Sequence, residues 1–256
     1  MKTRTLFGCA ALLAALFVPA TSQAQEAHGF GSQTQLILSA DRLVPLLSYS
    51  RTSITRNDGG VELTTATSTT SSSLLWGGRL GPDFVHTIPR VGIDVAIGST
   101  HLTLGGSAVL AFTLGGSRSA EAVQGGTKVE TSVDAPSTTV FGFAPRIGYI
   151  LALGDMFAIW LRGGVAFYSV RTKTYDDNAN NHDIDRSSAF SLDLDPQFTI
   201  VPMEHFFIGL GPLVNIPIAG SLTHEEVRGP RTDSRSDDLR VLQIGATASL
   251  GGWFNL

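Results

Sequence analysis

Apolar and polar residues alternate with a period of two through most of this chain after about residue 33. In the final segment, the even-numbered positions from Leu242 to Leu256 are apolar or small, and most odd-numbered positions are small or polar. Successive side chains of a β-strand point to opposite faces, so this pattern predicts a strand with one apolar face. Apolar residues at helical spacing are scarce. The chain is therefore predicted to be all-β.

Seven further segments alternate in the same way, and the connections between segments alternate in length. The eight predicted strands lie at about residues 33–49, 90–97, 102–113, 141–151, 157–168, 190–200, 206–218 and 242–256. Turns of three or four residues alternate with long polar connections at about 52–86, 115–137, 176–188 and 224–238. This order predicts an antiparallel up-and-down meander whose two ends face different environments. Arg42 interrupts the first apolar face, which indicates a β-bulge or an early end of that strand.

Residues 1–24 have the pattern of a cleavable secretory signal peptide. Two basic residues precede an apolar core at about 6–18, and small residues follow at 22–24. The core is shorter than the roughly 20 residues that a spanning helix needs. Cys9 lies in a loose lipobox, but too few residues precede it for a lipoprotein signal. We therefore predict an exported domain at residues 25–256.

Alternation alone leaves open which way the apolar faces point. They face inward in a soluble lipocalin-like barrel that binds an apolar ligand, and toward lipid in a transmembrane barrel. Only three of the 18 basic residues are lysines, and the polar faces carry mostly small residues, which suits a crowded barrel interior. Phenylalanines near the predicted strand ends match the aromatic girdles of transmembrane barrels: Phe112, Phe141, Phe157, Phe167, Phe190, Phe206 and Phe254. We therefore predict that the apolar faces point outward.

Charged residues in mid-strand predict an ionic network inside the barrel. Its members are Asp41, Arg90, Asp94, Arg146, Arg162, Asp193 and Asp195. Arg162 and Asp195 fall at similar depth on neighbouring strands, as do Arg90 and Asp41, and pairing is expected because an unpaired buried charge costs several kcal/mol. The network is expected to fill and register the barrel; a gate or proton path is the alternative.

This arrangement resembles the small eight-stranded outer-membrane β-barrels of Gram-negative bacteria, the OmpA/OmpX type. The likeness covers residues 25–256 and includes the C-terminal strand, although family members usually end in an aromatic residue and here Phe254 precedes the end by two positions. The resemblance implies periplasmic tight turns and termini, and long loops outside the cell. It also implies outer-membrane lipids and the barrel-insertion machinery, which reads the last strand, as partners, and no cofactor.

No residue set predicts catalysis or metal binding. Ser221, His224 and Glu225 are the nearest match to the Ser/His/carboxylate sets of lipid-modifying barrels, but alternation is expected to put Ser221 on the lumen face and His224 on the other. The acidic segment 176–185 has EF-hand-like oxygen spacing but lacks the turn glycine and the final glutamate of that loop. We expect a hydrated acidic loop there.

The sequence thus predicts an eight-stranded antiparallel transmembrane β-barrel with a non-enzymatic role. That role is structural, a surface interaction through an extracellular ligand at the loops, or a narrow pore for very small solutes. A soluble lipocalin-like barrel and an outer-membrane lipid-modifying enzyme are the alternatives. A net charge of −4 gives no basic excess for nucleic-acid binding.

Overall fold

The computed structural model describes residues 29–58, 61–71, 88–113, 116–124, 127–175 and 181–256; the predicted signal peptide lies outside them. Nearly all of this part is antiparallel β-sheet. The strands are β1 (Gln35–Asp58), β2 (Val61–Ser71), β3 (Arg90–Ile97), β4 (Leu102–Phe112), β5 (Ser117–Gln124), β6 (Thr127–Asp134), β7 (Ser137–Ala152), β8 (Phe157–Tyr175), β9 (Asn181–Leu194), β10 (Gln197–Met203), β11 (Phe206–Arg228) and β12 (Arg231–Asn255). In this part of the chain, no helix is long and apolar enough to cross a membrane.

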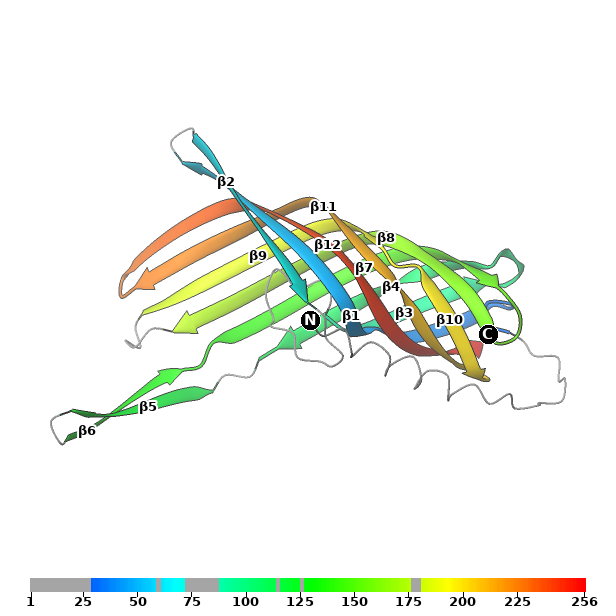
Figure 1. Ribbon diagram of the computed structural model, residues 1–256, viewed down its shortest axis with the longest axis horizontal. Coiled ribbons are helices and arrows are strands. Elements are labelled where there is room, and N and C mark those ends of the chain that lie inside the picture. Colours follow the sequence, from blue (N-terminus) through cyan, green and yellow to red (C-terminus); the bar gives the residue numbers. More distant parts are fainter. Residues whose placement is uncertain (1–28, 59–60, 72–87, 114–115, 125–126, 176–180) are drawn as a thin grey trace, which may run out of the picture.

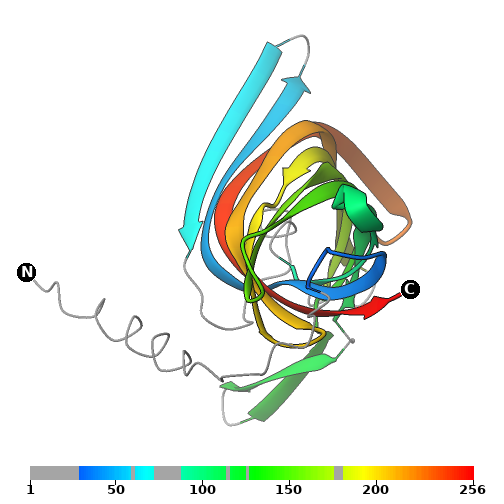
Figure 2. The same cartoon turned by 90° about the vertical axis from the view of Figure 1, so that its right-hand side faces the viewer.

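The strands form a closed ring, seen end-on in Figure 2. β11, β12, β1, β3, β4, β7 and β8 are neighbours in that order, and β9 and β10 each join β8 to β11. The first and last strands of the ring pair from Gln35–Asn255 to Thr55–Asp238. The ring therefore has no open seam between its first and last strands, as a membrane-spanning sheet requires.

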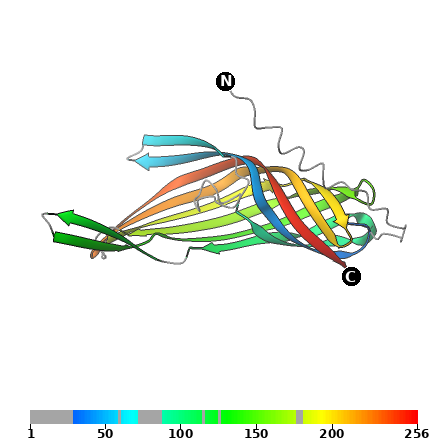
Figure 3. The ribbon, with the colours of Figure 1, turned by 60° about the horizontal axis from the view of Figure 1, so that its bottom comes forward.

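The described residues form twelve strands, more than the eight predicted, but the closed ring has the predicted eight positions, because β9 and β10 share one of them. β9 and β10 share one predicted segment, which is interrupted at Pro196 because proline has no N–H for the ladder. β2, β5 and β6 lie in connections that were predicted as loops. In the described residues, the long connections are largely regular hairpins, and Figures 1 and 3 show those of β1–β2 and β5–β6 projecting from the same end of the barrel. We call this the hairpin end, and the opposite end, with the short 3-10 helix η2 (Gly98–Thr100), the tight-turn end.

The outer surface of the ring is apolar. In β3, burial alternates at every residue, with Asp94 inside and Ile93 outside. Other large apolar side chains that are exposed on the ring include Val91, Leu104, Leu110, Phe143, Ile147, Leu161, Leu192 and Ile244. A soluble surface does not carry a continuous apolar belt of this kind, whereas a lipid-facing one does. The soluble lipocalin-like alternative is therefore wrong.

Aromatic side chains mark where the apolar belt ends toward the hairpins. Phe167 on β8 is the register partner of both Phe143 on β7 and Phe190 on β9, so the three form a row across the sheet. Beyond Phe167, the outward positions of β8 carry Arg171 and Lys173. The strands thus continue past the belt as a water-exposed sheet.

The seven predicted girdle phenylalanines lie on the outer side of the strands. Five are exposed: Phe112, Phe141, Phe167, Phe190 and Phe254. Phe157 and Phe206, next to the tight turns, are half-buried.

Inside the ring, two apolar layers enclose the charged residues. At the tight-turn end, Phe30 packs against Trp160, Phe207 and Trp253, with ring centroids 5.0–5.5 Å apart. Toward the hairpin end, small apolar side chains pack with Tyr168: Val109, Val140, Ala144, Ala166 and Val170. The charged residues between these layers are shielded from water on both sides.

The predicted bulge at Arg42 is confirmed. The register of β1 against β12 shifts between Ala40 and Val44, and Arg42 has a left-handed backbone with φ of 57°. In a regular strand, Asp41 and Arg42 would point to opposite faces. Here both side chains are buried inside the ring.

Candidate functional site

The first cluster of interior charges surrounds Asp193 on β9. Arg42 places Nη2 2.6 Å from Oδ1 and 2.8 Å from Oδ2 of this carboxylate. Arg90 Nη1 lies 3.1 Å from Oδ2, and Asn215 Nδ2 donates to Oδ1 at 3.0 Å. The donors come from β1, β3 and β11, so one carboxylate ties three strands to β9.

The second cluster is built on Arg146 of β7 and Arg162 of β8. Both guanidinium groups bind Asp41, with Nη1 of Arg146 2.6 Å from Oδ2 and Nη1 of Arg162 2.8 Å from Oδ1. Arg146 Nε donates to Asp94 Oδ1 at 2.9 Å, and Arg162 Nη2 donates to Asp195 Oδ2 at 2.7 Å. The planar guanidinium allows each arginine to join two carboxylates.

The structure brings all seven predicted interior charges together, with one pairing different from that expected. Arg162 binds Asp195 as predicted. Arg90 and Asp41 are register partners, but Arg90 binds Asp193 and Asp41 binds the two arginines of the second cluster. Side chains at the same register position can reach across the narrow interior instead of toward each other. Arg42 was missed as a member, although the break in alternation at this residue marked it.

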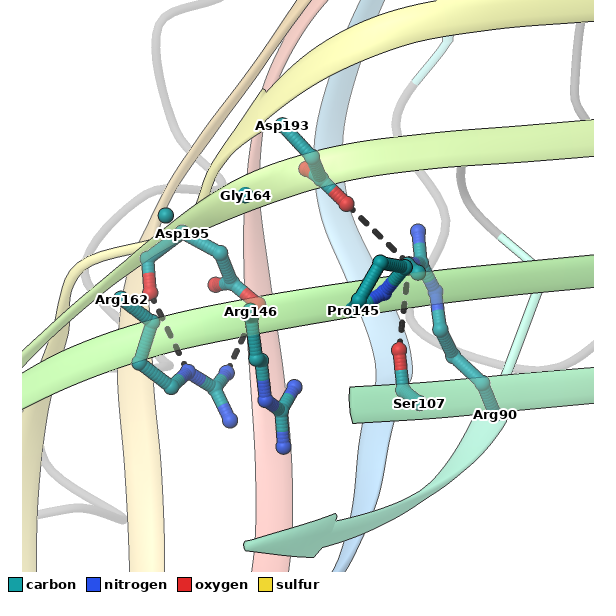
Figure 4. A pocket seen from close by; sticks show the side chains of 10 residues that line it. Arg90, Ser107, Pro145, Arg146, Arg162, Gly164, Asp193 and Asp195 are labelled. Atoms are coloured by element: carbon teal, nitrogen blue, oxygen red, sulfur yellow. Dashed lines mark hydrogen bonds and ion pairs between the residues drawn. The ribbon is translucent and has the colours of Figure 1, made fainter. Parts of the chain in front are cut away.

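Among the described residues, the charged interior is tightly packed. Its eight charges balance, with four arginines and four aspartates: Arg42, Arg90, Arg146, Arg162, Asp41, Asp94, Asp193 and Asp195. Five of them line a cavity of about 10 Å³, with Ser107, Pro145 and Gly164 also in its wall (Figure 4): Arg90, Arg146, Arg162, Asp193 and Asp195. That is room for about one water molecule. At the level of these charges, the described side chains thus leave too little space for the predicted narrow pore.

A histidine–carboxylate pair lies on the water-exposed sheet beyond the apolar belt. His224 on β11 and Asp185 on β9 are register partners, and Nδ1 of the ring is 2.7 Å from Oδ1 of the carboxylate. Their side chains are 38% and 49% exposed, so both meet solvent. A carboxylate in this position orients an imidazole and fixes which ring nitrogen can act as a base.

A bulge in β11 turns His224 inward, contrary to the prediction. From Asn215 to Ser221, six residue steps of β11 oppose five of β12, which reverses the alternation. Leu222 has the buried Ser187 and Asp237 as register partners, and His224 is two positions further along the same face. The prediction that Ser221 faces the lumen and His224 faces away is therefore wrong.

The other two residues of the predicted catalytic set lie on the opposite face of the sheet. Ser221 Oγ is 3.0 Å from Ser188 Oγ, and Glu225 Oε1 is 2.7 Å from Arg186 Nη1. Because successive side chains of a strand alternate between its faces, Ser221 and Glu225 both point away from the His224 imidazole. The structure thus separates the expected Ser/His/Glu set and joins His224 to Asp185 instead.

The acidic segment 176–185 is described only in part. Residues 176–180 lie outside the described residues, and 181–185 belong to β9. Among the described residues, no group of three His, Cys, Asp or Glu side chains is placed to hold a metal ion. Residues 181–185 are therefore strand and not the loop that was predicted.

A closed antiparallel ring with an apolar exterior and an ionic interior defines a membrane-spanning β-barrel. No family model matches the chain, and no curated protein is similar to it in sequence. Among solved structures it is similar to the outer membrane protease OmpT from Escherichia coli, with 11% identity over 92% of this chain and 100% of that chain and a TM-score of 0.36.

That similar protein is an enzyme, which contradicts the prediction that this chain has a non-enzymatic structural, surface-interaction or pore role. We withdraw that prediction. An identity of 11% and a TM-score of 0.36 do not carry the protease activity or its site over to this chain.

Proposed function

We propose that the protein is a bacterial outer-membrane barrel that carries a hydrolytic site on its extracellular sheet. The apolar belt and the closed ring support the membrane location, and the short turns at one end with long hairpins at the other support the periplasmic and extracellular assignments. The small ring supports a relation to the OmpA/OmpX type from Gram-negative cells. In this proposal, β12 is the strand that the barrel-insertion machinery reads.

One observation carries the hydrolytic assignment: the 2.7 Å hydrogen bond between His224 and Asp185 on the inward face of the sheet. Asp185 holds Nδ1, which leaves Nε2 as the general base. Because the Ser221 hydroxyl lies on the opposite face, the nucleophile is water. Nε2 takes a proton from this water as its oxygen attacks a carbonyl or phosphoryl centre, and then returns the proton to the leaving group.

Charged residues surround the pair on the neighbouring strands. On β12, Arg235 is the register partner of His224 and donates from Nε to Asp237 at 3.2 Å. Along β11, Arg228 binds Asp183 of β9 with a distance of 2.9 Å. The Arg228–Asp183 contact thus joins β11 to β9 on the hairpin side of His224 and limits movement of the pair.

The test compares purified barrels in detergent micelles and in phospholipid vesicles. Chromogenic acyl esters, fluorogenic peptides and a nitrophenyl phosphodiester serve as substrates. We expect His224→Ala to lower kcat for the hydrolysed class by at least about 100-fold and Asp185→Asn by about 10-fold or more, because positioned acid–base groups contribute 10²–10⁴-fold.

Glu225→Gln is the matched control. It removes an ion pair of equal length, 2.7 Å, from the next residue on the opposite face, and is expected to leave kcat unchanged. Full activity of His224→Ala, or no turnover of any of the three substrate classes by the parent protein, would overturn the proposal.

A further inference from the structure

The outer wall of the barrel is hollowed at one position of β8. Gly163 lies between the outward-facing Leu161 and Val165, and it has no side chain to cover the sheet. Its register partners are Ile147 on β7 and Leu194 on β9, both of which point outward and are exposed. A Cβ at residue 163 would lie 3.1 Å from Cδ2 of Leu194. The glycine thus forms the floor of a groove with aliphatic walls.

The groove has a volume of about 590 Å³ and extends to the tight-turn end. Its apolar lining comes from five neighbouring strands, β3, β4, β7, β8 and β9, and from Pro196 after β9: Ile97, Leu102, Leu104, Ile147, Tyr149, Leu161, Leu194 and Pro196. Thr103 and Arg162 also line it, but Thr103 accepts a hydrogen bond from Trp160 inside the ring and Arg162 binds the interior carboxylates. The accessible surface of the groove is therefore apolar.

We propose that this groove binds one acyl chain of a phospholipid from the leaflet at the tight-turn end. The groove is continuous with the apolar belt, so in the bilayer it is filled by hydrocarbon and not by water. At the Gly163 floor, the flanking strands β7 and β9 stand two strand spacings apart, about 10 Å, before side chains are counted, and toward the tight-turn end the groove continues across β4 to β3. A transmembrane helix, about 10–12 Å in diameter, does not reach the floor between β7 and β9, whereas a single hydrocarbon chain does.

At the tight-turn end of the groove, aromatic rings lie where the headgroup of such a lipid is expected. Tyr149 lines the groove, and its ring lies 6.0 Å from that of His101, which follows η2. Amphipathic rings of this kind are enriched at the level of the headgroups. The acyl chain would run from Tyr149 past Leu161 to the floor at Gly163. This inference depends on the membrane-spanning wall and is independent of the His224 pair.

The test uses native mass spectrometry of the purified barrel in detergent, titrated with palmitoyl-oleoyl phosphatidylethanolamine. The parent protein is expected to retain one phospholipid with a Kd well below that of any further lipid. Gly163→Leu fills the floor and should weaken this first binding step at least about tenfold. Ala108→Leu introduces the same side chain at an exposed outward position of β4 outside the groove, and should leave it unchanged.

A second pair of variants keeps the test independent of crowding at residue 163. Ile147→Ser makes one wall polar, and Val91→Ser makes the same kind of change outside the groove; the two side chains are equally exposed, at 66% and 64%. Only Ile147→Ser should weaken the first lipid.

The absence of a distinct first lipid would overturn the proposal, as would equal binding by all four variants. A dimer that is present in the parent protein and lost in Gly163→Leu would assign the groove to a second copy of the chain instead.

Discussion

Arg42 and Asp193 are 151 residues apart in the chain, yet the Arg42 guanidinium reaches across the ring to within 2.6 Å of the Asp193 carboxylate. Their strands, β1 and β9, are not neighbours in the sheet. The contact exists because the bulge at Arg42 turns this side chain inward. One local irregularity of the backbone thus connects two separate walls of the barrel.

Arg42→Met tests the energetic weight of this contact. The variant leaves Asp193 with Arg90 as its one arginine partner in the cluster and gives the interior a net negative charge. Breaking a buried ion pair by removing one partner costs about 3–5 kcal/mol, and we expect a loss of this size in the free energy of unfolding from vesicles in urea. Arg231→Met, which removes an exposed ion pair with Asp233, should cost less than about 1 kcal/mol. Equal costs for the two variants would contradict this account.

Arg162 and Asp195 should be energetically coupled. We expect Arg162→Ala combined with Asp195→Ala to be less destabilised than the sum of the single variants, with a coupling of about 0.5–3 kcal/mol, because contacting charges are not additive. The exposed pair Arg186–Glu225 has the same 2.7 Å separation as Arg162–Asp195. Its own double-mutant cycle should give about 0.2–1 kcal/mol. Additive effects at Arg162 and Asp195 would show that the pair is not coupled.

Ile93→Arg and Leu63→Arg distinguish the membrane-facing wall from the sheet beyond it. Both parent side chains are 54% exposed, but Ile93 lies on the apolar belt and Leu63 on the β1–β2 hairpin. A charge on the lipid face near the bilayer centre costs about 2–4 kcal/mol, falling toward zero at the interfaces. We therefore expect this loss of stability in vesicles for Ile93→Arg and almost none for Leu63→Arg. A neutral Ile93→Arg would exclude this residue from the hydrocarbon region.

Gly31→Ala should displace the aromatic residue that closes the tight-turn end. Gly31 has φ of +79°, and a Cβ there would lie 2.6 Å from Cγ2 of Ile150. The added methyl would push Phe30 out from between Trp160, Phe207 and Trp253. We expect a loss of more than about 1 kcal/mol, together with a weaker near-ultraviolet circular dichroism signal from the tryptophans.

Gly31→Ala combines the cost of a positive φ with a clash against Ile150, and Gly154→Ala separates the first effect from the second. Gly154 also has a positive φ, +133°, but nothing lies within 4 Å of its added Cβ. It should carry only the backbone cost and keep the tryptophan signal. An unchanged tryptophan signal in Gly31→Ala would mean that Phe30 stays in place.

The strands of the ring could be read from alternation because each strand meets lipid on one side and a crowded interior on the other. This is why Ile93 and Asp94 already differ in the pattern and then in the structure. β2 was not predictable in the same way, since nearly all its described side chains are exposed on both faces. β2, with its run of threonine and serine, therefore had the composition of a loop.

The candidate sites were predictable only where the alternation is unbroken. Arg162 and Asp195 follow it and were paired correctly, whereas a bulge reverses it before His224. A single inserted residue changes the face of every later residue in the strand. The pair of His224 and Asp185 depends on where β9 and β11 meet beyond the membrane, which local composition does not encode.

The partners of Asp193 also constrain how the barrel is assembled. Its donors lie on β1, β3 and β11. Early and late strands of the chain must therefore both be in place before all three donors can reach the Asp193 carboxylate. A half-formed sheet would hold these charges against hydrocarbon, which is prohibitive for unpaired ions. We therefore expect the last seam, β1 against β12, to join while the interior is still hydrated. Expulsion of water from the interior and neutralisation of its charges then become a single cooperative step of insertion.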